Sequence, residues 1–195
     1  GQVPVPITIA AVGDHSLRLS GEACDGVRLH PFCTRSYLED VVMKRIEEGM
    51  AKTGRTRETF EITGGGFVAT GETDEEVDKI AEWVRYRIAF YGSTPSYWPV
   101  FEHHGHGDLG RKLNKMTKEG KWDQIAAEIP DDVLHDFAAI ARYDQLQTAV
   151  EKRFGGAADA IYASTSQDIR PAIPAEVLQD MARIPTAFQG FSKLW

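Results

Sequence analysis

Residues 5–13 read Val5-Pro6-Ile7-Thr8-Ile9-Ala10-Ala11-Val12-Gly13, and this stretch decides the fold class. It is an almost unbroken apolar run, which predicts a strand buried on both faces, as strands of parallel sheets are. Gly13 ends the run, and Asp14 can cap a short helix directly after it. A buried strand followed at once by a helix begins a βαβ unit, so the stretch favours an α/β fold.

The rest of the chain continues this alternation. Three more strands are predicted, at 27–30, 59–70 and 158–163, and the second of them contains the glycines Gly64 to Gly66. Capping signals and helical spacing of apolar residues predict the helices between and after them. These helices cover about 36–54, 73–88, 109–118, 122–129, 131–140, 143–154 and 174–184. Consecutive strands separated by helices pair in parallel through crossover connections.

Four strands are half of the number that closes a (β/α)8 barrel. The pattern therefore predicts an α/β fold with parallel strands, and about half of a parallel (β/α)8 TIM-barrel type is one architecture that it fits. We expect residues 1–195 to form a single domain with a helical insertion at about 92–141, because no repeat or flexible linker interrupts them. A small open α/β sheet is the alternative architecture.

Composition excludes several classes of protein. The chain has 22 Lys and Arg against 29 Asp and Glu, so its formal net charge is 22 − 29 = −7, and no basic stripe suits a nucleic acid. No apolar run reaches the roughly 20 residues that span a bilayer. The start is not a signal peptide, and two cysteines are too few for a disulfide scaffold, so we expect a cytoplasmic protein. Because the chain opens without Met, it begins after a tag remnant or partway through a larger protein.

Two places carry candidate binding chemistry. Small residues at 10–13, before a predicted helix N-terminus, let the backbone approach an anion, although the turn lacks the GxGxxG fingerprint. His30 ends the second predicted strand, where a parallel barrel has its active-site face, and a neutral imidazole there can donate a hydrogen bond or act as an acid or base. The alternatives are a plain tight turn and a partly buried histidine beside Pro31.

Other polar groups have less support. Cys24 and Cys33 lack zinc-site spacing and are expected to be buried thiols, and we predict no metal site. The cluster at 103–108 contains three histidines and is expected to be a solvated or capping loop, or a substrate-side wall. Tyr97 and Trp98 before it can roof an apolar pocket or simply pack. No nucleophile elbow or phosphate loop is present.

Two blocks of sequence resemble a known family. Residues 6–13, 17–22 and 24–27 are similar to the P-I-x-x-A-A-x-G-P…L-x-G-x-x-A-D-G-V pattern of luciferase-like flavin and deazaflavin oxidoreductases. Residues 90–97 and 104–109, which include Tyr-Gly-Ser-Thr-Pro-Ser-Tyr and His-Gly-x-Gly-Asp-Leu, resemble the subgroup that uses coenzyme F-420, a deazaflavin. The resemblance covers most of the chain, from Val5 to about Ala163.

The resemblance implies that this chain is the second half of the barrel, strands five to eight. It assigns the cofactor phosphate to Ala10, Ala11, Val12 and Gly13, and the cofactor ring to Leu29, His30, Pro31 and Phe32, with His30 as the catalytic residue. Tyr97, Trp98 and His104 would lie on the substrate side. Asp14 departs from the usual proline, and a carboxylate there is unfavourable unless it faces away from the phosphate. Ala141-Arg142 replaces a usual glycine-containing helix start.

The implied activity is hydride transfer between coenzyme F-420 and an organic small molecule. An FMN-dependent monooxygenase of the same superfamily is the alternative within enzymes. A non-catalytic half-barrel is the alternative outside them, because exposed sheet edges favour pairing with the missing N-terminal half or with a second copy. We expect a homo-oligomeric parent, and an isolated chain that is inactive or weakly active.

Overall fold

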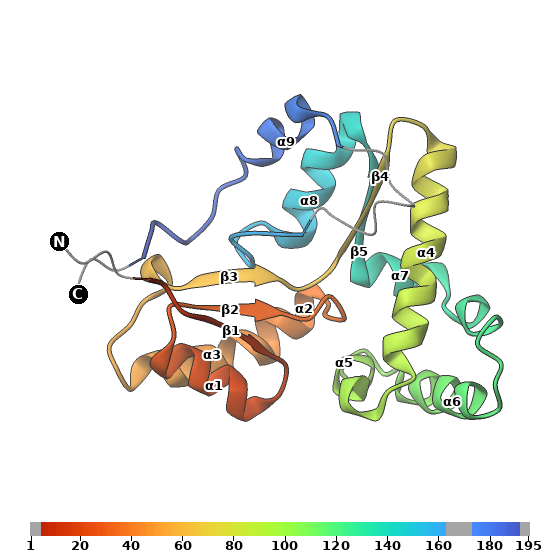
Figure 1. Ribbon diagram of the computed structural model, residues 1–195, viewed down its shortest axis with the longest axis horizontal. Helices are drawn as coiled ribbons and strands as arrows, with labels where there is room; N and C mark the ends of the chain where they lie inside the picture. The colour runs from red at the N-terminus through yellow and green to blue at the C-terminus, as the bar shows by residue number, and fades with distance from the viewer. Residues whose placement is uncertain (1–4, 163–172, 192–195) are drawn as a thin grey trace. The chain divides into compact units, whose positions relative to one another are not determined.

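The computed structural model describes residues 5–162 and 173–191, and they divide into two compact units (Figure 1). The first unit comprises 5–65, 154–162 and 185–191, and the second comprises 66–153 and 173–184. The expectation of a single domain stays a prediction.

A three-stranded parallel sheet forms the centre of the first unit. Strands β1 (Thr8–Ala11), β2 (Gly26–Leu29) and β3 (Glu61–Gly64) lie in that order, and an isolated parallel bridge joins Thr63 to Ala160. Helices α1 (Asp14–Ala23) and α3 (Met43–Ala51) lie side by side against the sheet in Figure 1. The predicted parallel pairing is confirmed.

Helices α1 and α3 pack unusually closely because two glycines face the partner helix. A Cβ atom on Gly21 would lie 2.1 Å from the carbonyl oxygen of Ile46, and one on Gly49 would lie 2.0 Å from that of Arg18. Below the helices, apolar side chains of the sheet and both helices form one core. Its fully buried members include Leu17, Val27, Leu38, Ile46, Phe60 and Ile62.

Strand β1 is not buried on both faces as predicted. Ala11 is buried in the core, but Ala10 is exposed and Val12 is 43% exposed. Among the described strands of its sheet, β1 pairs only with β2 and lies at the edge. As an edge strand among those described, β1 is covered less completely than a central strand of a parallel sheet.

The predicted strand at 59–70 is two strands. β3 ends at Gly64 and β4 (Phe67–Gly71) begins three residues later. Gly64 and Gly65 have φ values of 94° and 92°, a conformation that glycine adopts without steric cost and that interrupts an extended strand. The glycine run thus separates the two sheets.

The second unit contains β4 paired in parallel with β5 (Ala138–Arg142). The long helix α4 (Asp74–Gly92) packs on β4, with Thr73 accepting a hydrogen bond from the Glu76 N–H as its predicted cap. The remaining helices are α5 (Trp98–His103), α6 (Gly107–Lys118), α7 (Asp131–Phe137), α8 (Leu146–Phe154) and α9 (Ala175–Met181).

Several predicted boundaries are wrong. Residues 138–140 belong to β5 rather than to a helix, and 122–129 holds only a 3-10 turn, Ile125–Glu128. The α1 cap is Gly13, not Asp14, and Thr34 caps the short α2 (Arg35–Tyr37), which a π-helical turn, Leu38–Val42, joins to α3. The predicted strand 158–163 is reduced to the bridge at Ala160, and residue 163 lies outside the described residues.

The observed architecture is thus a parallel α/β fold whose described strands do not close a barrel. Within the described ranges, no helix is both long and apolar enough to cross a membrane.

Candidate functional site

The carboxyl ends of β1 and β2 bring two predicted site segments together. Ala11 is paired with Leu29 in the parallel register, so the chain leaves the sheet next through Val12-Gly13 on one strand and His30-Pro31 on the other. Gly13 and His30 therefore lie at the same end of the sheet, where the carboxyl ends of the strands are. Antiparallel pairing would have placed them at opposite ends.

The turn at 10–13 is open to an approaching group. Gly13 is the N-cap of α1, and a Cβ atom added to it would meet nothing within 4 Å. The Gly13 carbonyl accepts from the Leu17 N–H at 3.0 Å and from Ser16 Oγ at 2.9 Å. The N–H groups of the first turn of a helix point outward without helical partners, so this edge offers donors suited to an anion.

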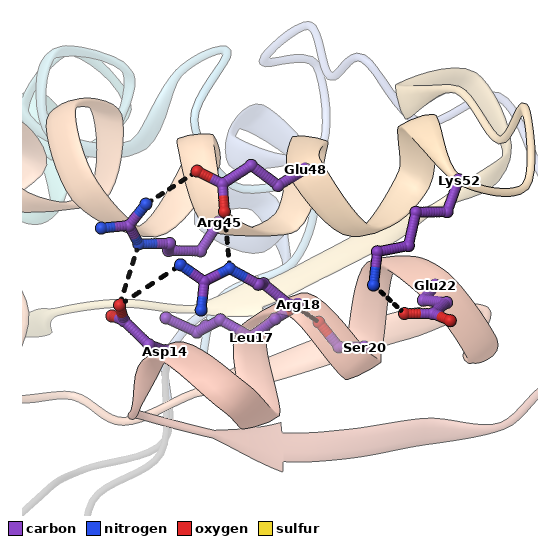
Figure 2. A network of polar contacts seen from close by, with 8 residues as sticks. All are labelled: Asp14, Leu17, Arg18, Ser20, Glu22, Arg45, Glu48 and Lys52. Atoms are coloured by element: carbon purple, nitrogen blue, oxygen red, sulfur yellow. Dashed lines mark hydrogen bonds and ion pairs between the residues drawn. The ribbon is translucent and has the colours of Figure 1, made fainter.

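Asp14 follows the turn and is held by two arginines (Figure 2). Its Oδ2 lies 3.1 Å from Nε of Arg45 on α3 and 3.5 Å from a guanidinium nitrogen of Arg18 on α1. Glu48 accepts from Arg18 Nε at 2.6 Å and from Arg45 Nη1 at 2.7 Å. Asp14, Arg18, Glu48 and Arg45 thus form a closed arrangement of alternating charge, which we call the ion ring.

The charges of the ion ring stabilise one another. Hydrogen bonds from Arg18 and Arg45 lower the pKa of the Glu48 carboxyl, and the hydrogen bond to Glu48 raises the pKa of Arg45. Burial raises the pKa of the Tyr37 hydroxyl, and the neighbouring Cys33 and Asp14 add to the effect. At the far end of the same helices a single pair, Lys52 and Glu22, is 2.7 Å apart (Figure 2).

The His30 ring has a defined hydrogen-bonding role. Its Nδ1 accepts from the Phe32 N–H at 3.0 Å. A neutral imidazole that accepts at Nδ1 carries its proton on Nε2, so the ring is a donor at that atom. Leu29 and Phe32 are buried, at 5% and 2% exposed, and the Phe32 N–H is already donated to His30.

The three predicted substrate-side residues belong to the second unit. Trp98 donates from Nε1 to the Gly92 carbonyl at 3.0 Å, and its ring occupies the space that a Cβ on Gly110 would need, so it packs α5 against α4 and α6. Tyr97 stacks edge-on against Tyr91, and burial raises the pKa of its hydroxyl.

His104 is the most perturbed histidine of the second unit. Its Nδ1 lies 3.5 Å from Asp136 Oδ2, and its side chain is 18% exposed. Burial lowers the pKa of the imidazole, and the Asp136 carboxylate opposes this shift only in part. In the described part of the chain, no group of three or more His, Cys, Asp or Glu residues is placed to hold a metal ion.

Sequence reasoning missed the ion ring and Tyr37. Arg45 and Glu48 are visible only as an i, i+3 pair on a predicted helix, which is an ordinary surface pattern. Their proximity to Asp14 depends on the close crossing of α1 and α3, which no local pattern reports.

The class of protein follows from comparison with known families. Residues 1–159 match the luciferase-like monooxygenase family, so the chain belongs to that family. A more distant relative from Mycobacterium tuberculosis, 25% identical over 85% of this chain and 49% of its own length, is named a putative coenzyme F420-dependent oxidoreductase.

Individual relatives are similar to most of this chain but are longer than it is. An uncharacterised protein of Mycobacterium tuberculosis is 38% identical over 184 residues, which cover 92% of this chain and 53% of the relative. The 5,10-methylenetetrahydromethanopterin reductase of Archaeoglobus fulgidus is 28% identical over 69% of this chain and 40% of its own length. The chain therefore spans about half the length of the curated relatives it matches.

A solved structure shows the same fold. The coenzyme F-420 dependent tetrahydromethanopterin reductase from Methanopyrus kandleri superposes with a TM-score of 0.69 at 17% identity. The match covers 92% of this chain and 50% of that one. The chain thus has the α/β fold of about half of a TIM-barrel reductase.

Proposed function

We propose that this chain is the C-terminal half, strands five to eight, of an oxidoreductase that transfers hydride between coenzyme F-420 and a small organic molecule. The observation that carries the proposal is the position of Gly13 and His30 at the carboxyl ends of adjacent parallel strands. Parallel barrels hold their ligands at that end.

The residues at this edge fit a phosphate-bearing cofactor. The space beside Gly13 is open, and the N-terminus of α1 presents N–H donors to an anionic tail. His30 would donate from Nε2–H to the cofactor ring, and the bond from the Phe32 N–H to Nδ1 orients the imidazole. A bound deazaflavin would supply the hydride chemistry, and the chain would orient it and exclude water.

On the substrate side we assign Tyr97 and His104, with Trp98 holding the start of α5. Burial favours the neutral form of His104, so this imidazole can donate or accept one proton near neutral pH.

The rest of the barrel is proposed to dock on the β1 edge. Ile7 and Val12, directly before and after β1, are 60% and 43% exposed, and Leu19 of the following helix α1 is 52% exposed. The missing N-terminal half would supply a parallel strand and a helix, and these two elements would cover the exposed side chains. We also propose that the complete protein is a homo-oligomer and that it is located in the cytoplasm.

The experiment is a pair of titrations with coenzyme F-420 and with FMN, followed by visible absorbance and fluorescence. We expect saturable binding with F-420 preferred, and weaker binding in Gly13→Glu, which places a carboxylate at the turn in open space. Circular dichroism checks that this variant folds. Tighter binding of FMN would support the alternative, an FMN-dependent monooxygenase of the same family, and binding of neither would contradict both.

A further inference from the structure

The ion ring lies at the end of α1 where the proposed function, on which this inference rests, requires an anion. Asp14 is the first residue of α1, directly after the open turn. Its side chain is 53% exposed, so it remains in contact with solvent beside the turn. Two carboxylates and two guanidiniums make the ion ring neutral as a whole.

An aspartate at this place has two opposing effects. A carboxylate in the first turn interacts favourably with the helix dipole. The same carboxylate repels a phosphate a few ångströms away, and the repulsion is stronger where water is excluded. Asp14 interacts with the helix dipole whether or not a ligand is bound. Its effect on the binding of an anionic ligand is therefore set by the repulsion.

The geometry shows how the repulsion is offset. Arg45 reaches across from α3 and lies nearer to Asp14, at 3.1 Å, than Arg18 does at 3.5 Å. Glu48 holds both arginines, Arg18 at 2.6 Å and Arg45 at 2.7 Å. Because Arg18 belongs to the same helix as Asp14, Arg45 is the one of the two that connects the Asp14 carboxylate to α3, as Figure 2 shows.

We propose that Arg45 is a positioning residue that holds and neutralises Asp14, and thereby keeps the turn at 10–13 open to the anionic tail of the cofactor. Arg45 acts through Asp14 and does not itself touch the ligand. The consequence is a dependence between the two residues: Arg45 matters for anion binding only while Asp14 is a carboxylate.

A double-mutant cycle tests this dependence. The variants are Arg45→Met, Asp14→Asn and the pair together, with Lys52→Met as a matched control that removes the single ion pair at the other end of the same helices. The probes are coenzyme F-420 and the same deazaflavin without its phosphate-bearing tail. Dissociation constants come from fluorescence titration, and urea unfolding of each variant reports stability separately.

We expect Arg45→Met to weaken F-420 binding about tenfold, which corresponds to about 1.4 kcal/mol, without affecting the tailless deazaflavin. Asp14→Asn should bind at least as well as the parent chain, and adding Arg45→Met to it should cause no further loss. Lys52→Met should leave both affinities unchanged. A loss that persists in the Asp14→Asn background would assign Arg45 to the ligand directly and overturn the proposal, and so would the absence of any loss.

A second measurement separates this proposal from the proposed function. Inorganic phosphate is titrated while the backbone amides of residues 13–16 are followed by NMR. If F-420 does not bind, the proposed function fails, but phosphate shifts that weaken in Arg45→Met and recover in the double variant support the role of Arg45. Phosphate shifts that are equal in all variants, or absent from the parent chain, overturn it.

Discussion

Gly49 is the residue on which the packing of α1 and α3 most depends. A Cβ at this position would lie 2.0 Å from the Arg18 carbonyl oxygen, far inside van der Waals contact. Alanine gains about 1 kcal/mol in helix propensity over glycine, while overpacking costs typically 1–3 kcal/mol or more. Because backbone must move, overpacking should win, and Gly49→Ala should destabilise by about 2 kcal/mol in urea unfolding.

The control for this prediction is Lys44→Ala, on an exposed position of the same helix. It should change stability by less than about 0.5 kcal/mol. Equal stability of Gly49→Ala and the parent chain would show that the helices do not approach as closely as described. Gly49→Ala should also loosen the ion ring, since the close packing of α1 and α3 brings Arg45 to Asp14.

His104 should make stability depend on pH. Burial lowers the pKa of its imidazole below the ordinary value of 6.5, so as pH falls the unfolded chain takes up this proton before the folded chain does. Stability should therefore decrease as pH drops below about 6.5, and be fully present above it. His104→Asn should remove this part of the pH dependence, measured as urea midpoints across that range.

Asp136 provides a second variant for the same site. Its carboxylate favours the imidazolium, so Asp136→Asn should lower the pKa of His104 further. An NMR titration of the His104 ring reports this directly. A titration midpoint of His104 above 6.5 in the parent chain would contradict the assigned burial effect.

For individual residues, the sequence predicts where a residue lies in the fold better than it predicts which side chains that residue contacts. Parallel strands require that the residues after 11 and after 29 meet at one edge, so the approach of Gly13 and His30 follows from the alternation of elements alone. The partners of Asp14 do not follow, because they depend on where α3 crosses α1. Trp98 illustrates the same limit: its residue type suits a pocket roof equally well, and only Gly92 and Gly110 reveal its packing.

Asp159 connects several elements of the first unit. It is paired with Arg57 through two hydrogen bonds of 2.9 and 3.0 Å, and its side chain is 3% exposed. It also accepts from the N–H groups of Ile62 in β3, at 2.7 Å, and of Phe188, at 3.1 Å. One carboxylate thus joins β3, the segment before it and the 185–191 segment.

Removing this charge should cost much more than removing an exposed one. Breaking a buried ion pair from one side typically costs about 3–5 kcal/mol, so Asp159→Ala should destabilise the chain by roughly that amount in urea unfolding. Asp180→Ala breaks an exposed pair with Arg183 and should change stability by less than about 1 kcal/mol. Similar losses in both variants would contradict the connecting role of Asp159.

At the element scale, local pattern succeeds where packing agrees with it. The apolar stripe of α4 and its Thr73 cap predict that helix correctly because each local preference agrees with its position on β4. The sequence Ala-Ala-Ile-Ala-Arg of β5 contains good helix formers, and it is a strand because it pairs with β4, far earlier in the chain. Gly64 and Gly65 indicate an irregularity, but only their φ values show that the strand ends there.

At the scale of the whole molecule, the β1 edge should decide how the 195-residue chain behaves in solution. Among the described strands β1 is paired on one side only, and a strand edge that lacks a partner favours association with another strand. Ile7, directly before β1, and Leu19 of α1 are 60% and 52% exposed. We expect the chain to self-associate in a concentration-dependent way in sedimentation velocity. Ile7→Lys combined with Leu19→Lys should shift it toward monomer, since a charge on the edge opposes pairing.

Leu178 supplies the matched control, because it is a similarly exposed leucine, at 44%, on α9 of the second unit. Leu178→Lys should leave self-association unchanged if the β1 edge is responsible. In a longer polypeptide that carries the rest of the barrel, the same edge would be covered, and the lysine substitutions should then reduce folding stability instead of oligomer content. A chain that stays monomeric at every concentration and unfolds in one sharp transition would show that the edge needs no partner.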